Sequence, residues 1–249
     1  MQAPALSPRR REALRFLIAT LAVTALYLAV QHLQLVAVGS LARSGWFSGN
    51  PQVELADEAR AIAARSAPAE AKLTPEHALA AWRLGYLLGY LSEWLGAYGA
   101  QPEATMLGLR ARMEDNLARA QGFADRLGIG PVAPMPVRTA RDFAQIRERM
   151  EADEWGLAGR VEAVTSPRIR HLFMLGLQVG ITAASLDDAP EGPLPIPPSG
   201  LIGKHATLAG LPADRWSALT RLEDRGDAKA AAAAYRAQAE RLDAAIAAR

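Results

Sequence analysis

The chain has 249 residues, of which 28 are Lys or Arg and 26 are Asp or Glu, and it contains no cysteine. The lack of cysteine excludes a disulfide framework, a thiolate metal site and a cysteine nucleophile, and a mean hydropathy of +0.01 disfavours both a disordered chain and a polytopic transporter. The pI of about 9.1 suggests nucleic acid as a partner, but the basic excess comes from four arginines near the N-terminus. Without these four and Glu12 the totals fall to 24 basic and 25 acidic residues, so we expect no nucleic-acid partner.

An apolar run over residues 16–38 follows these arginines, which are Arg9, Arg10, Arg11 and Arg15. At about 1.5 Å per residue, the run is long enough to cross a hydrocarbon core of roughly 30 Å. The sequence therefore predicts a basic tail over 1–15, a transmembrane anchor in the lipid bilayer over 16–38, and a tether over 39–53. Because basic residues precede the run and only Arg43 follows it closely, we expect a cytoplasmic N-terminus and an exported remainder.

The predicted compartment depends on this apolar segment and on the arginine and lysine content of the chain. Arginine outnumbers lysine by 25 to 3, which suggests a GC-rich bacterial genome and hence a single-pass inner-membrane protein with a periplasmic C-terminal domain. The alternative is a cleaved signal peptide, with an apolar region over 16–30 and a small-residue cleavage site at Ser40-Leu41-Ala42. Cleavage near Ala42 would leave a soluble periplasmic protein.

Glycine and proline divide the exported part into helices, and strand signals are almost absent. We expect helices over 53–65, 75–98, 102–127, 139–164, 167–186 and 212–222, and a final one from 227. The predicted fold class is all-α, a helical bundle or stacked helical hairpins. The predicted organisation is a helical domain over 54–186, a Pro/Gly-rich loop over 187–203 and a C-terminal helical hairpin over 204–249, in which the last helix packs antiparallel on 212–222.

Two of these helices share a short sequence motif in which two glycines lie four residues apart. Gly85 and Gly89 lie in the first helix, and Gly176 and Gly180 lie in the second. Glycines at this spacing lie on one face and let another backbone approach closely, which offsets their helix-propensity cost of about 1 kcal/mol each. We therefore predict that the two helices cross at these glycines. The two motifs are also a candidate internal repeat with an offset of 91 residues.

The 75–98 helix also carries an aromatic residue at every fourth position, namely Trp82, Tyr86, Tyr90, Trp94 and Tyr98. Three interpretations of this stripe stay open: core residues, a ligand wall, and a docking surface for a partner or for lipid headgroups. Glu93 lies within the stripe, where burial would raise the pKa of its carboxyl group.

No phosphate-binding loop, dinucleotide fingerprint, nucleophile elbow or zinc-ligand spacing is present in the sequence. His77 and His171 would converge on a metal or haem only if their two helices were related by pseudo-symmetry, and their unequal distances from the glycines favour helix-terminal or surface roles. We therefore expect no catalytic residue, no metal and no cofactor. The predicted function is a periplasmic scaffold or accessory subunit of a membrane protein complex. The alternative is a periplasmic enzyme or small-ligand carrier that uses Glu93 and the Trp82 to Tyr98 stripe.

Overall fold

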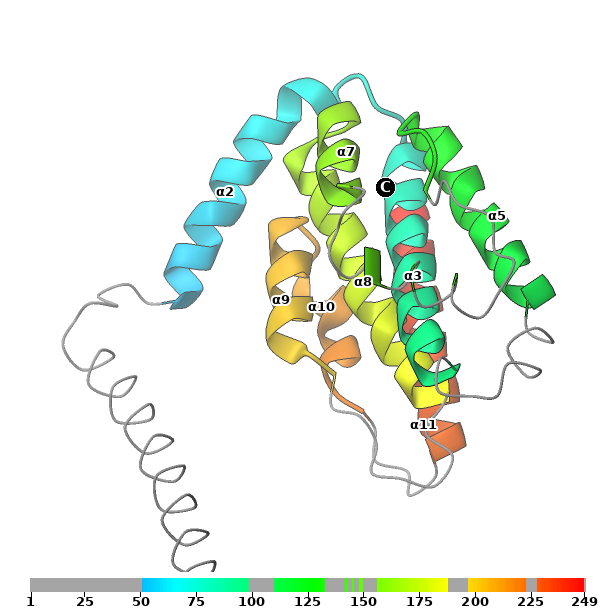
Figure 1. The fold of residues 1–249 in the computed structure, drawn as a ribbon. Coiled ribbons are helices and arrows are strands. Elements are labelled where there is room, and N and C mark those ends of the chain that lie inside the picture. The colour runs from blue at the N-terminus through cyan, green and yellow to red at the C-terminus, as the bar shows by residue number, and fades with distance from the viewer. Residues whose placement is uncertain are drawn as a thin grey trace, which may run out of the picture. The chain divides into compact units, whose positions relative to one another are not determined.

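The structure is a computed structural model that describes residues 51–98, 110–132, 142, 145, 148–149, 156–187, 197–222 and 228–248. All regular structure in these ranges is helical, which confirms the all-α prediction (Figure 1). The chain divides into two compact units, Met1–Val53 and Glu54–Arg249. The predicted tail, anchor and cleavage site lie outside the described residues, so the account below concerns the second unit.

The helices begin and end close to their predicted positions in the middle of the chain. In chain order they are α2 (Pro51–Glu70), α3 (Pro75–Tyr98), α5 (Arg110–Leu127), α7 (Leu157–Val164), α8 (Pro167–Asp187), α9 (Ser199–Leu208), α10 (Ala213–Trp216), the 3-10 helix η1 (Ser217–Thr220) and α11 (Ala228–Ala247). Proline stands at the first position of α3 and α8, where its missing N–H costs nothing. Ser166 Oγ caps α8 by accepting a hydrogen bond from the Ile169 N–H at 3.1 Å.

Three predictions about the elements are wrong. The predicted helix over 139–164 does not pass through Gly156, which has φ of 55° in the left-handed region, so α7 begins only after it. The predicted loop over 187–203 contains the start of α9, because Ile202 is fully buried and draws this segment onto the core. The predicted helix over 212–222 consists of the short α10 and η1.

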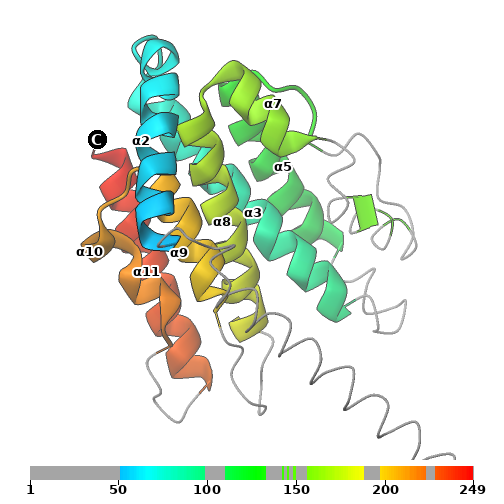
Figure 2. The ribbon, with the colours of Figure 1, turned by 90° about the vertical axis from the view of Figure 1, so that its left-hand side faces the viewer.

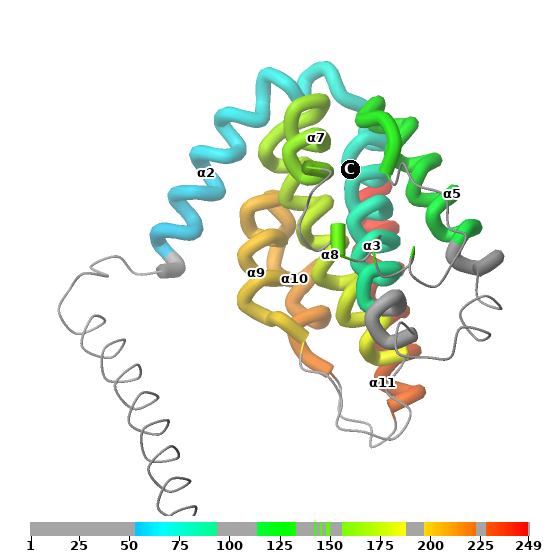
Figure 3. The backbone as a smooth tube through the Cα atoms, in the orientation of Figure 1, coloured from blue at the N-terminus to red at the C-terminus, as the bar shows by residue number. Residues whose placement is uncertain are grey.

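The α3–α8 contact lies at the centre of the unit, and the four glycines form it. A Cβ added to Gly85 would overlap the carbonyl oxygen of Phe173, and one added to Gly89 would overlap that of Leu177. In return, Cβ atoms on Gly176 and Gly180 would overlap the carbonyl oxygens of Trp82 and Tyr86. Each glycine thus faces the carbonyl three residues before the equivalent glycine of the other helix. The two helices therefore run in the same direction and meet through a locally two-fold contact (Figure 3).

Apolar clusters cover both sides of the α3–α8 pair. On one side, buried residues of α5 and α7 pack on the two helices through Leu84, Leu88 and Phe173. On the other side, α9, η1 and α11 pack on them through Trp82, Leu175 and Val179. The unit therefore has three layers, with the glycine-bearing pair in the middle (Figures 1 and 2).

The position of α8 explains its apolar composition. Within the described residues α8 is the helix that is long and apolar enough to cross a membrane, with a hydropathy of 1.3, yet 61% of that stretch is buried inside the protein. A helix that has core on two sides needs apolar residues all round. We therefore interpret α8 as the core helix of this unit.

The final helix packs differently from the prediction. Its buried residues Ala232, Tyr235, Ala239, Leu242 and Ile246 form a seam along one face, at spacings of three and four residues. They pack mainly on α8 and α3, however, and only at the edge on α10 and η1. The expected hairpin with 212–222 is wrong because that segment contains no helix long enough to cover the seam.

Helix α2 is attached to the N-terminus of α8 by polar side chains. The Arg168 N–H donates to the buried Ser66 Oγ at 3.1 Å, and Ser166 Oγ donates to Glu70 Oε1 at 2.7 Å. The Arg168 guanidinium also pairs with the Glu70 carboxylate. A carboxylate is favourable here because the first N–H groups of a helix carry partial positive charge.

Substitution of a central glycine tests the α3–α8 contact. Gly85→Ala places a methyl group on the backbone of α8, so the free energy of unfolding should fall by at least about 2 kcal/mol. The matched control is Gly122→Ala in α5, where an added Cβ meets no atom within 4 Å. The control should gain about 0.5 to 1 kcal/mol from helix propensity. Urea denaturation of the two variants measures both values, and equal stabilities would contradict the close contact.

Candidate functional site

The aromatic stripe on α3 turns gradually from the core to the surface. Trp82 is 2% exposed, whereas Tyr86 and Tyr90 are half-buried. Their rings follow one another along the helix, with centroids 6.2 Å apart for Trp82 and Tyr86 and 6.5 Å apart for Tyr86 and Tyr90. The side chains of Trp94 and Tyr98 lie outside the described residues. The two half-buried tyrosines are thus the described part of the stripe that a partner or ligand could reach.

An ion pair joins α3 to α11 beside these tyrosines. Arg83 donates from Nε to Asp243 Oδ1 at 2.8 Å and from Nη2 to Asp243 Oδ2 at 2.6 Å. This bidentate pair raises the pKa of Arg83, chiefly through the hydrogen bonds to Asp243. The pair fixes the distance between the two helices at this point.

Asp187 makes a second polar junction at the end of α8. It accepts a hydrogen bond from Tyr90 Oη at 2.9 Å and pairs with Arg236 Nη1 at 3.1 Å. A carboxylate at a helix C-terminus is unfavourable because the last carbonyl groups carry partial negative charge. The tyrosine of α3 and the arginine of α11 offset that cost and hold three helices together.

A pocket of about 210 Å³ opens between α3 and α11 next to these junctions. We call it the α3–α11 groove, and its lining residues are Trp82, Tyr86, Arg236, Ala239, Glu240 and Asp243. Its chemistry is mixed, since two aromatic rings form one wall and charged side chains form the other. Arg236 and Asp243 are held in ion pairs, while Glu240 is exposed to solvent.

The tyrosines beneath the groove are strongly desolvated. Burial, assisted by the Asp187 carboxylate, raises the pKa of Tyr86 to about 12. Tyr235 of α11 is 1% exposed, and burial raises the pKa of its hydroxyl further. The Tyr235 hydroxyl lies near Thr182, but Thr182 Oγ1 donates to Gln178 O at 2.9 Å, and Tyr235 Oη has no hydrogen-bond partner. Both tyrosines are therefore neutral at physiological pH.

Glu93 is not part of the groove. It is half-buried and accepts a hydrogen bond from Ser185 Oγ of α8 at 3.0 Å. It lines neither the α3–α11 groove nor the second pocket described below. The structure therefore separates Glu93 from Trp82 and Tyr86, which the sequence grouped with it as one cleft.

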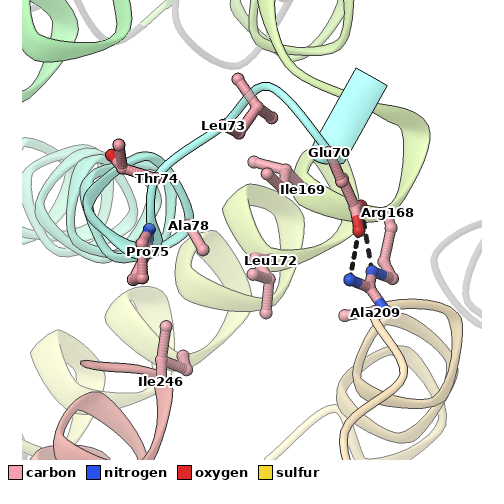
Figure 4. Close-up of a pocket in the computed structure, with 10 residues that line it drawn as sticks. All are labelled: Glu70, Leu73, Thr74, Pro75, Ala78, Arg168, Ile169, Leu172, Ala209 and Ile246. Carbon is pink, nitrogen blue, oxygen red and sulfur yellow. Dashed lines mark hydrogen bonds and ion pairs between the residues drawn. The ribbon is translucent and has the colours of Figure 1, made fainter. Parts of the chain in front are cut away.

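A second pocket, of about 200 Å³, lies where α2 ends and α3 and α8 begin. Figure 4 shows its apolar wall, formed by Leu73, Ala78 and Leu172 among others, and the Glu70–Arg168 pair at its edge. The polar groups at this edge are engaged with one another, since Glu70 binds both Arg168 and Ser166. This pocket is therefore part of the attachment of α2.

The histidines play local roles that the sequence identified only in part. His77 lies at the start of α3, where its Nδ1 accepts a hydrogen bond from the Thr74 N–H at 3.2 Å and so helps to cap the helix. His171 of α8 pairs with His205 of α9, with their Nδ1 atoms 3.0 Å apart. From the sequence we considered a pairing of His77 with His171. His205 was not predicted as a partner, because nothing in the spacing shows that α9 folds onto α8.

Among the residues that the structure describes, no group of three or more His, Cys, Asp or Glu side chains has a geometry that could hold a metal ion. Comparison with protein-family models, with curated proteins and with solved structures gives no match to this chain. The inference of function therefore depends on the geometry of the α3–α11 groove and on the sequence.

Two tyrosine substitutions test the polar contacts around the groove. Tyr235→Phe removes a buried hydroxyl without a partner, so stability should stay the same or rise by about 1 kcal/mol. Tyr90→Phe removes the hydrogen bond to Asp187, so stability should fall by about 1 kcal/mol. Thermal unfolding of the two variants, which differ from wild type by one oxygen each, gives the comparison. The assignment would be wrong if Tyr235→Phe were the more damaging change.

Proposed function

We propose that the protein is a membrane-anchored helical scaffold, an accessory subunit whose α3–α11 groove docks a protein partner within a membrane complex. The observation that carries the proposal is this groove, in which the half-buried Tyr86 ring lies near the exposed Glu240 carboxylate. The helices that form the groove are joined by an ion pair, and a second ion pair joins α11 to α8. Protein-binding surfaces are enriched in aromatic residues at their centre and carry polar residues at their rim. The anchor rests on the sequence of residues 16–38 and on the arginines before it.

The geometry favours a protein partner over a small molecule. The groove is smaller than the cavities of roughly 300 to 1,000 Å³ that enclose small ligands. Two interhelical ion pairs border it, so its shape is set before anything binds. A prearranged surface loses little entropy when a partner docks.

The chemistry of the groove also indicates the kind of side chain that it accepts. Arg83 and Arg236 are neutralised by Asp243 and Asp187, whereas Glu240 faces solvent beside the ring of Tyr86. A carboxylate next to an aromatic ring suits a cation, which gains both a charge contact and a cation–π contact. We therefore propose that a Lys or Arg side chain of the partner occupies the groove.

Charge reversal at the groove tests the partner proposal. Tagged full-length protein is recovered from native membranes in mild detergent, and stoichiometric partners are identified by mass spectrometry. Glu240→Arg should reduce partner recovery by at least about tenfold, because it places a like charge opposite the cation. Asp115→Arg, a reversal on the exposed surface of α5, is the matched control and should retain the partner.

Two results would contradict the scaffold proposal. One is recovery of the wild-type protein without any stoichiometric partner. The other is equal recovery of the partner with Glu240→Arg and Asp115→Arg, which would place docking elsewhere. Thermal unfolding of each variant shows that the fold is intact before the comparison is made.

An N-terminal epitope tag tests the anchor separately. If residues 16–38 span the membrane, the tag should remain on the mature protein and stay in the membrane pellet after an alkaline wash. If the chain is cleaved near Ala42, the mature protein should lose the tag and appear in the soluble periplasmic fraction. Replacing Phe16 to Val30 by a known cleavable signal peptide provides the control for complete release.

A further inference from the structure

Two histidines from different helices meet at the edge of the three-layer unit. His171 is the fifth residue of α8, and His205 lies in the last turn of α9. Their Nδ1 atoms are 3.0 Å apart, while their ring centroids are 5.3 Å apart. The two nitrogens therefore lie between the rings, close to the line that joins the centroids. This geometry is that of an N–H···N hydrogen bond, in which one imidazole donates from Nδ1 and the other accepts at Nδ1.

The protonation chemistry of such a pair is asymmetric. In the neutral pair, the donor ring still has a free Nε2, so a first proton binds there and leaves the hydrogen bond in place. A second proton must bind at the accepting Nδ1. Both facing nitrogens then carry hydrogen, no acceptor is left between them, and two positive rings face each other.

Charged groups from three helices and from α9 itself surround the pair. Arg170 of α8 and Lys204 of α9 oppose protonation, whereas Glu58 of α2 and Glu162 of α7 favour it. Glu162 is already paired with Arg170 at 3.0 Å, which weakens its effect on the histidines. Burial is the largest cause in each ring, and it lowers the pKa of His171 and lowers that of His205 to about 4.

We propose that the His171–His205 hydrogen bond is an acid-sensitive latch, which holds residues 197–222 on α8 and releases them when both imidazoles are protonated. These residues comprise α9, α10 and η1, and we call them the latch segment. The segment covers α8 with Ile202, Ala206 and Leu208, which are at most 1% exposed. Release therefore exposes an apolar surface on both the latch segment and α8.

The direction of the pH dependence follows from the pKa values. A released histidine has an ordinary pKa near 6.5, whereas the latched His205 has a pKa of about 4. Below pH 6.5 the open state therefore binds more protons than the closed state, and closure weakens as the pH falls. Between about pH 6 and pH 4 the opening equilibrium should rise by up to tenfold per pH unit for each proton taken up.

Hydrogen exchange of the full-length protein in mild detergent tests the latch. We expect the exchange of latch-segment amides, corrected for the intrinsic pH effect, to accelerate at least about tenfold between pH 7 and pH 4.5. Amides of α3 in the same sample should change much less, because the four glycines that join α3 to α8 meet the other helix through backbone atoms and not through histidine side chains. Equal changes in the two segments, or no change in either, would overturn the proposal.

A conservative variant separates the latch from general acid unfolding. In His205→Gln the amide still donates to His171 Nδ1 but takes up no proton, so the pH dependence of exchange should fall to half or less. His77→Gln is the matched control, because it removes a histidine that caps α3, and it should keep the wild-type pH dependence. If His205→Gln retains the full dependence, the latch is wrong.

Nuclear magnetic resonance of ring-labelled histidine gives a readout that does not depend on any variant. The chain contains four histidines, so the spectrum is simple. At pH 7.5, His171 and His205 should show opposite tautomers, one protonated at Nδ1 and the other at Nε2, and His205 should titrate well below pH 6.5. Ordinary titration of both rings near pH 6.5 would overturn the proposal, as would a spectrum that changes when EDTA removes metal ions.

Discussion

The backbone contact between α3 and α8 is the constraint on which the rest of the unit depends. Because Gly85, Gly89, Gly176 and Gly180 have no side chains, the carbonyl groups of each helix reach the backbone of the other. The two helices together form the central layer of the unit, with apolar residues on both of its sides. The outer helices take their positions from those two surfaces, and the α3–α11 groove takes its floor from one of them.

The glycine contact was predictable from the sequence, whereas the outer layer was not. Glycine lacks a Cβ wherever it occurs in a chain. Two glycines four residues apart therefore mark the face of a helix that another backbone can approach. The position of α9 depends instead on burial of Ile202 against α8, after a stretch rich in proline and glycine that resembles a loop. For the same reason no local pattern could pair His171 with His205.

The aromatic stripe shows why the candidate site was predicted only in part. Residues four apart on an α-helix are rotated by about 40° relative to one another, so a strict four-residue stripe winds around the helix. Trp82 is therefore buried in the core, whereas Tyr86 and Tyr90 are half-buried, and of these two tyrosines Tyr86 lines the groove. The core interpretation is correct for Trp82, whereas docking at the tyrosines stays a prediction. Glu93, three residues beyond Tyr90, has already turned toward Ser185 of α8.

The layers also differ in the kind of interaction that holds them. At its four glycines the central contact consists of backbone atoms, which carry no titratable group. The outer helices are attached through titratable or charged pairs, namely Arg168–Glu70 for α2, Arg83–Asp243 for α11 and His171–His205 for α9. Histidine is the residue type in these pairs whose unperturbed pKa lies near neutrality, so under the proposed latch the attachment of α9 is the one that mild acid weakens. The fold thus combines a central contact made by backbone atoms with outer helices that are attached through charged or titratable side chains.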